Sequence, residues 1–214
     1  MQNFLSKFPL SRLRRLRTES WVRELVKEST LSIKDLILPI FINYDDKSTE
    51  IKSMPGVKRY CLNEALEKIN EAKEIGIKAV AIFPQVPAEK KDTYGTEALN
   101  DENIVCKSIR KIKKEISGIG VISDIALDPY TSSGHDGILE DSIIKNDKTI
   151  EVLLKQAKLN SDAGCDILAP SDMMDGRVLK MREMLEYNGY HEVLIMSYAA
   201  KYASSLYAPF REAV

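Results

Sequence analysis

The chain has 214 residues, of which 44% are hydrophobic and 29% are charged, and its 31 basic and 32 acidic side chains give a formal net charge of −1. A disordered chain would carry fewer apolar residues and a larger charge imbalance. No apolar run reaches the about 18 residues that would indicate a membrane span, and the near-neutral charge disfavours a general nucleic-acid binder. We therefore expect a globular protein with neither nucleic acid nor membrane as a partner.

Residues 1–30 are predicted to form an arm that precedes the globular domain. Residues 1–10 lack the apolar core of a secretory signal. The arginine-rich run 12–17 is compatible with an organelle presequence or a phosphate-binding patch. A solvated or subunit-contacting arm is favoured, because Glu19 and Glu24 follow closely and the apolar residues form no clean stripe.

The remaining residues, 31–214, alternate short apolar runs with amphipathic stretches. Nearly continuous apolar runs are typical of strands buried on both faces, and apolar residues three or four apart are typical of helices. The predicted strands are residues 36–42, 79–83, 120–125, 166–170 and 193–197, and the predicted helices are residues 63–75, 104–116, 149–163 and 176–187. This alternation predicts an α/β domain with a parallel sheet, right-handed crossovers and no internal boundary.

Three cysteines, Cys61, Cys106 and Cys165, lie at wide spacings and form no CxxC pair. Their odd number and spacing indicate reduced thiols in a cytoplasmic protein rather than a disulfide framework or a zinc cluster. The sequence also contains no HExxH, Walker or GxGxxG pattern, which argues against a zincin, a P-loop enzyme and a dinucleotide binder. We therefore expect no organic cofactor.

Polar side chains follow three successive predicted strands. Parallel α/β folds place their active sites at the carboxyl ends of the strands, so these side chains are expected to converge on one mouth. They are Asp124, Asp128, His135 and Asp136 after the third strand, Ser171, Asp172 and Asp175 after the fourth, and Tyr198, Lys201, Tyr207, Phe210 and Arg211 after the fifth.

Lys201 is the most informative of these residues, because it follows an apolar strand within a stretch of small and aromatic side chains. Desolvation in such surroundings lowers the pKa of a lysine toward neutrality, and a neutral amine attacks ketones to form Schiff bases. On position alone, a lysine at the start of a helix that extends to solvent is the commoner case.

The other polar residues also have two interpretations each. Asp124, Ser171 and Asp172 are candidates for moving protons or holding a substrate amine, and Arg211 is a candidate for pairing with a substrate carboxylate. The alternatives are helix caps and surface ion pairs, and capping is the commoner role for Ser171 and Asp172, which lie just ahead of a predicted helix.

Several long segments resemble the porphobilinogen synthase (5-aminolaevulinate dehydratase) family. The segments are residues 53–57, 124–131, 134–137, 169–177, 196–198, 201–204 and 209–211, and the arginine-rich N-terminal segment matches as well. The resemblance implies a TIM barrel, a (β/α)8 fold. It also implies a lyase that condenses two 5-aminolaevulinate molecules into porphobilinogen through lysine Schiff bases, with loss of two waters, in tetrapyrrole (haem) biosynthesis.

The resemblance also implies roles for individual residues. Lys201 matches the first of two Schiff-base lysines, which holds the substrate of the A site, and the second lysine lies on a following strand. Asp124 and Ser171 match residues for substrate-amine contact and proton transfer, and Asp172 is expected to contact substrate with them. Tyr207 and Phe210 match pocket walls, and Arg211 matches the residue that binds the A-site carboxylate.

The metal requirement follows from three matching positions. Zinc-dependent members carry three cysteines where this chain has Ala126, Asp128 and Asp136. Thiolates suit zinc and carboxylates suit harder cations, so the chain resembles the zinc-independent, aspartate-type branch. We assign no metal ligand in this segment and expect Mg²⁺, where it acts, to have ligands elsewhere. The resemblance further implies a homo-octamer.

Five of the eight strands of a (β/α)8 barrel are predicted, preceded by the arm, and the 214 residues fall short of the ~250 that are typical of the whole barrel. We expect strands one and five to keep unpaired edges. Three hypotheses remain open from sequence. The first is that the chain is part of a working synthase. The second is that it is a catalytically dead structural or interaction protein, and the third is that it is a half-site Schiff-base lyase or binder of aminolaevulinate.

Overall fold

The computed structural model describes residues 7–205 and 207–214, so the first six residues of the predicted arm lie outside the described residues. The chain divides into two units, Met1–Asp35 and Leu36–Val214. The first unit contains the 3-10 helices η1 (Leu13–Arg17) and η2 (Ile33–Asp35) and the helix α1 (Ser20–Leu25), none of which has a buried residue. Its apolar side chains, such as Trp21 and Leu25, are exposed.

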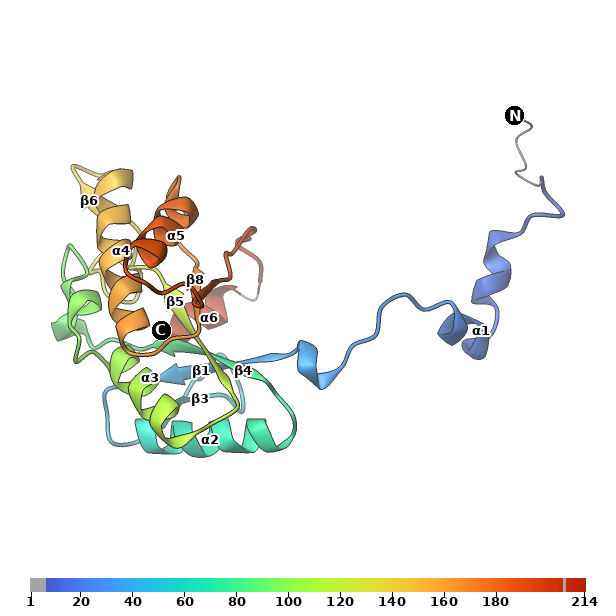
Figure 1. Cartoon of the computed structure of the whole chain (residues 1–214), viewed down its shortest axis with the longest axis horizontal. Coiled ribbons are helices and arrows are strands. Elements are labelled where there is room, and N and C mark those ends of the chain that lie inside the picture. Colours follow the sequence, from blue (N-terminus) through green and yellow to red (C-terminus); the bar gives the residue numbers. More distant parts are fainter. Residues whose placement is uncertain (1–6, 206) are drawn as a thin grey trace. The chain divides into compact units, whose positions relative to one another are not determined.

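The second unit is built on one seven-stranded sheet with the order β2-β3-β1-β4-β5-β8-β9 (Figure 1). The five predicted strands are confirmed as β1 (Ile37–Ile42), β4 (Ala79–Pro84), β5 (Gly120–Ile125), β8 (Ile167–Pro170) and β9 (Leu194–Ile195). They pair in parallel and in chain order. The predicted α/β class is therefore correct, and the sheet is that of a partial (β/α)8 barrel.

The predicted helices are confirmed as the crossovers between these strands. They are α2 (Leu62–Glu74), α3 (Ile104–Glu115), α4 (Asn146–Asp162) and α5 (Arg177–Tyr187). Asn103 caps α3, since its side chain accepts a hydrogen bond from the Cys106 N–H at 2.9 Å. Gly76 follows the end of α2 with a φ of +102°, a left-handed conformation that glycine adopts without steric cost.

Alternate residues of each strand face two different cores. Ile40 and Ile42 of β1 pack on the side covered by α2, α3, α4 and α5. Phe41 of β1 faces the other side, where it joins Phe83 of β4 and Phe210 of α6 (Tyr207–Ala213). The ring centroids of Phe41 and Phe83 are each within 5.7 Å of that of Phe210. The chain after Lys201 thus returns to cover the concave face of the sheet.

Two short elements and one edge differ from the sequence prediction. The stretch between β1 and α2, in which no element was predicted, contains β2 (Thr49–Glu50) and β3 (Lys58–Tyr60). Because β3 pairs in parallel with the end of β1, the prediction that strand one keeps a wholly unpaired edge is wrong. The outer edge of β9 has no strand partner within the described residues, as predicted.

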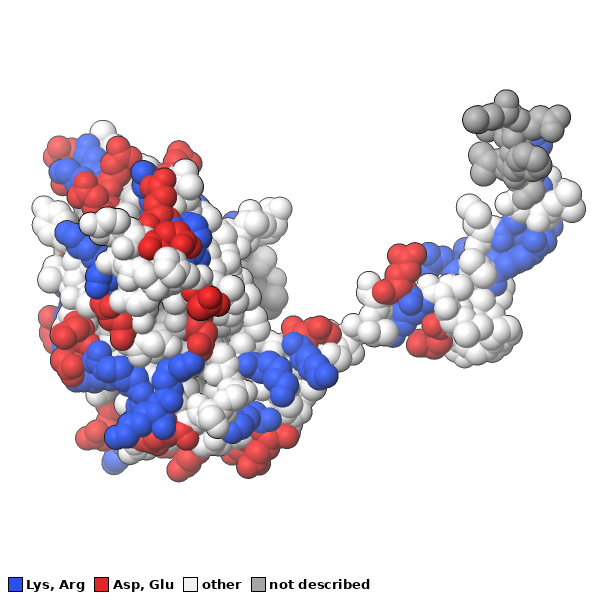
Figure 2. All heavy atoms as spheres, in the orientation of Figure 1, with Lys and Arg blue, Asp and Glu red and all other residues white. Residues whose placement is uncertain are grey.

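The loops at the carboxyl ends of the strands carry the remaining elements. They are the 3-10 helices η3 (Ala88–Lys90) and η4 (Thr96–Leu99) after β4, and the hairpin of β6 (Leu139–Glu140) and β7 (Ile143–Ile144) after β5. On the face drawn in Figure 2, acidic and basic side chains of this unit are interspersed. Within the described residues, no helix is long and apolar enough to cross a membrane.

Candidate active site

A cavity of about 240 Å³, which we call the Asp124 cavity, opens at the carboxyl ends of β5, β8 and β9. Five predicted site residues line it: Asp124, Ser171, Lys201, Tyr207 and Phe210. A cavity of about 470 Å³, which we call the Lys91 cavity, adjoins it and is lined by Lys91, Arg211 and, again, Lys201. The convergence of polar groups from three strand ends is therefore confirmed.

Lys201 is held between the loops that follow β5 and β8. Its Nζ donates hydrogen bonds to Asp136 Oδ2 at 3.0 Å and to the Ser171 carbonyl oxygen at 2.9 Å. Burial lowers the pKa of Lys201, but the hydrogen bond and charge of Asp136, together with the charges of Asp128 and Tyr207, leave that pKa above its ordinary value. The predicted lowering toward neutrality is wrong, because Asp136 stabilises the ammonium form.

Asp124 is half-buried and lines the same cavity as this lysine. Its Oδ1 is buried and has no hydrogen-bond partner among the described residues. Burial and the neighbouring charge of Asp128 raise the pKa of Asp124 from 3.8 to about 7, although Ser171 and Lys201 act in the opposite direction. A carboxyl group with this pKa is present in both protonation states near neutral pH, so it can donate or accept a proton.

Asp172 lies outside the lining of both cavities. Its Oδ2 accepts the Met174 N–H at 2.8 Å, and its Oδ1 lies 3.0 Å from Nε of Arg177 in the first turn of α5. The Asp172 side chain is fully buried in this arrangement. The structure thus favours the local structural interpretation of Asp172, and its contact with substrate stays a prediction.

Arg211 lies on α6, a short helix that is hydrogen-bonded to the β2–β3 edge of the sheet. The Ser53 hydroxyl donates to the Pro209 carbonyl at 3.2 Å, and Nε of Arg59 donates to the Ala213 carbonyl at 3.0 Å. The Arg211 guanidinium lies over the Tyr207 ring at 4.7 Å from its centroid. It forms no ion pair with a described carboxylate and remains open to the Lys91 cavity. Arg211 is thus available to an anion, as predicted.

A family model described as delta-aminolevulinic acid dehydratase matches residues 10–214. The chain belongs to this family. The resemblance drawn from the sequence motifs is therefore confirmed. Similar curated relatives bear the same name: one from Bradyrhizobium diazoefficiens is 48% identical over 204 residues, and one from Methanothermus sociabilis is 49% identical over 209 residues. These alignments cover 95% and 97% of this chain but 58% and 64% of the relatives.

A solved structure supports the same family. It is the delta-aminolevulinic acid dehydratase (porphobilinogen synthase) of Toxoplasma gondii, in complex with the reaction product porphobilinogen. The TM-score is 0.90 at 40% identity, over 95% of this chain and 58% of that one. The predicted barrel fold is confirmed, and the chain spans about three-fifths of the length of the relatives it matches.

For a member of the dehydratase family, the three predicted metal positions are informative. Ala126 has no ligating side chain, and Asp136 is occupied by its contact with Lys201. Within the described part of the chain, no three His, Cys, Asp or Glu side chains are grouped to hold a metal ion. Because a structural or catalytic zinc site requires at least three protein ligands, these residues do not fit a zinc ion.

The sequence placed Asp136 among the converging polar residues and at a metal position, but it did not predict the contact of Asp136 with Lys201. The two residues are 65 positions apart in the sequence, so no local spacing pattern predicts their contact. One signal was present: Asp136 and Asp128 both stand on the loop after the third strand, within a segment that resembles the family. Lys91, which lines the adjoining cavity, was missed altogether.

Proposed function

We propose that the chain provides the Schiff-base half of a porphobilinogen synthase site, with Lys201 as the nucleophile toward the ketone of 5-aminolaevulinate. The observation that carries this proposal is the position of Lys201, whose Nζ lies in a partly apolar cavity between Asp136 and Ser171. In the whole protein, the proposed reaction joins two 5-aminolaevulinate molecules into porphobilinogen with loss of two waters.

The contacts of Lys201 support a specific order of proton transfers. The ammonium first gives a proton to the Asp136 carboxylate, 3.0 Å away. The neutral amine then adds to the ketone carbon, and the carbinolamine hydroxyl leaves as water once it is protonated. Asp124, with a pKa of about 7, is suited to supply that proton. Ser171 and the rings of Tyr207 and Phe210 would then position the bound substrate.

A binder or half-site lyase is a second candidate, because Lys201 alone suffices to form an imine with a ketone. Both candidates form the same imine and differ in whether porphobilinogen appears. The family resemblance supports extending the proposal to a cytoplasmic homo-octamer for the whole protein.

The proposal is tested by reduction with borohydride in the presence of 5-aminolaevulinate. We expect one covalent adduct on the intact chain, mapped to Lys201 by peptide mass spectrometry, and no adduct at that position in Lys201→Ala. An unmodified, folded chain without an adduct on Lys201 would contradict the proposal. Colorimetric assay of porphobilinogen then separates a complete synthase from a half-site.

We further propose that imine formation needs no zinc, since Ala126 and the occupied Asp136 leave no zinc donor set. Dialysis against a chelator is expected to leave the rate of borohydride capture unchanged, and added Zn²⁺ should not increase it. We place the ligands of any Mg²⁺ outside this segment as part of the same proposal. Loss of capture on chelation followed by recovery with Zn²⁺ would refute the assignment.

A further inference from the structure

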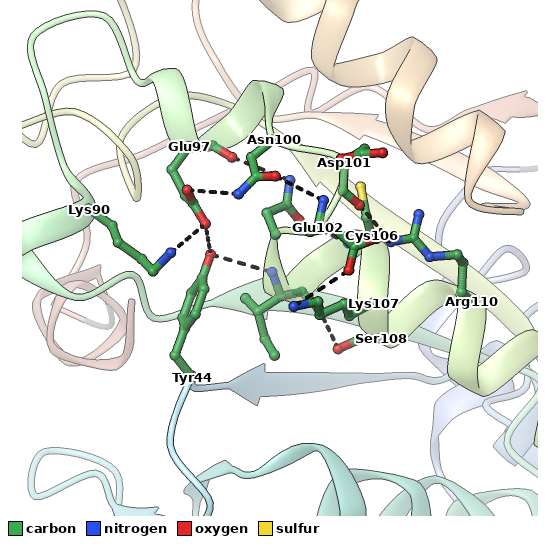
Figure 3. Close-up of polar contacts among 12 residues, drawn as sticks. Tyr44, Lys90, Glu97, Asn100, Asp101, Glu102, Cys106, Lys107, Ser108 and Arg110 are labelled. Atoms are coloured by element: carbon green, nitrogen blue, oxygen red, sulfur yellow. Dashed lines mark hydrogen bonds and ion pairs between the residues drawn. The ribbon is translucent and has the colours of Figure 1, made fainter.

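Two adjacent lysines at the end of η3 face different surroundings. The backbone becomes extended at Lys91, with φ −88° and ψ 136°, directly after the 3-10 turn that ends at Lys90. Figure 3 shows Lys90 directed toward Glu97 and Tyr44; its Nζ lies 3.2 Å from Glu97 Oε1 and 5.0 Å from the centroid of the Tyr44 ring. Lys91 is half-buried and lines the Lys91 cavity instead.

The segment that carries Lys91 is fixed to the loop after β5. The Asp92 N–H donates to the Tyr130 carbonyl at 3.3 Å, and the Ser132 N–H donates to the Asp92 carbonyl at 2.8 Å. The Asp92 side chain also accepts the N–H groups of Tyr94 and Thr96 at 2.9 and 3.0 Å. Lys91 is therefore anchored beside the loop that bears Asp128 and Asp136.

Three cations and two carboxylates, those of Asp128 and Asp136, line the Lys91 cavity, and the three cations differ in their partners. Lys201 is paired with Asp136, whereas neither Lys91 nor Arg211 forms an ion pair with a carboxylate of residues 7–205 and 207–214. Burial lowers the pKa of Lys91, and the charge of Asp128 offsets only part of that effect. A half-buried ammonium without a paired anion is unfavourable, so the cavity is suited to receive one.

We propose that Lys91 is a substrate-binding residue that, together with Arg211, holds the carboxylate of the keto acid whose carbonyl carbon is attacked by Lys201. This inference rests on the proposed function where it assumes that Lys201 attacks the ketone. The binding of the carboxylate does not depend on that attack. A short oxo acid carries a carbonyl and a carboxylate on one chain, and the cavity presents Lys201 together with two unpaired cations to such a molecule. The ligand is thus a short keto acid.

Borohydride capture as a function of ligand concentration tests the role of Lys91. In Lys91→Met, we expect the half-saturating concentration of 5-aminolaevulinate to rise about five-fold or more, the effect of losing one partly exposed charge pair. The same variant should leave capture of 1-aminobutan-2-one, an aminoketone without a carboxylate, unchanged. Lys91→Arg should restore binding, and Lys90→Met, the adjacent lysine, should alter neither ligand.

The outcomes separate this inference from the proposed function. If Lys91→Met weakens the binding of both ligands equally, or of neither, Lys91 does not contact the carboxylate. Its role is then to interact with Asp128 or to stabilise the fold. Binding of pentanoate, a carboxylate without a ketone, is measured in parallel by NMR. Pentanoate binding that depends on Lys91, in a chain that forms no adduct, would refute the Schiff base alone. Pentanoate binding independent of Lys91 would refute this inference alone.

Discussion

Asp124→Asn is expected to slow borohydride capture of 5-aminolaevulinate about 100-fold at pH 7, the usual contribution of a general acid. The carbinolamine formed on Lys201 must lose its hydroxyl as water, and an amide cannot protonate that group. Asp124 can, because burial and the charge of Asp128 raise its pKa to about 7. The rate is measured by quenching with borohydride at successive times and quantifying the adduct by mass spectrometry.

The same substitution is expected to stabilise the folded chain at high pH. In the unmodified protein, the pKa of Asp124 is higher in the folded than in the unfolded state, so the folded state binds the extra proton between pH 4 and 7. The free energy of unfolding therefore falls as pH rises through that range. Asn carries no charge, so Asp124→Asn should gain about 2–4 kcal/mol at pH 8 and little at pH 4.

Urea denaturation at pH 4.5 and pH 8 measures this difference. Asp101→Asn is the matched control, because Asp101 is exposed and outside both cavities. A gain in stability that is the same at both pH values would contradict a raised pKa for Asp124. If capture is slower but stability shows no pH-dependent gain, Asp124 still acts as the proton donor. Burial is then excluded as the cause of a raised pKa.

The strands and crossovers could be predicted because each leaves a local pattern. β4, β5 and the second half of β1 are buried on both faces, so nearly every residue there is apolar, and the helices between them show one apolar face. β9 was predicted too long, because its observed extent depends on pairing with β8 and not on its own residues. β3 was missed, since a three-residue strand with polar side chains has no periodic signal.

The sequence predicted which residues form the site, because that depends on residue type and position. It did not predict the properties that depend on contacts between distant residues. Lys201, Asp124 and Ser171 were found from strand ends and motifs, and they do converge. The pKa of Lys201 was predicted in the wrong direction, because apolar neighbours in sequence said nothing of Asp136. Asp172 has the residue type of a substrate contact, but its ion pair with Arg177 places it in the wall.

Asp136→Asn is expected to lower the pH at which Lys201 is captured half-maximally by at least about one unit. The Asp136 carboxylate holds the pKa of Lys201 above its ordinary value, against burial, which lowers it. Removing that negative charge leaves burial opposed by the charge of Asp128, so the neutral amine forms at lower pH. The initial rate of borohydride capture, measured for both proteins from pH 8 to pH 12, gives the two midpoints.

The rate at the plateau of this profile distinguishes two roles of Asp136. If Asp136 only stabilises the ammonium, Asp136→Asn shifts the midpoint and leaves the plateau unchanged; if it also accepts the proton during attack, the plateau falls as well. Glu140→Gln is the control, because Glu140 lies on the same loop as Asp136 but lines neither cavity. Its carboxylate pairs with Lys148 of α4 at 2.7 Å. A midpoint that does not move would show that the 3.0 Å contact between Asp136 and Lys201 does not set the protonation of the amine.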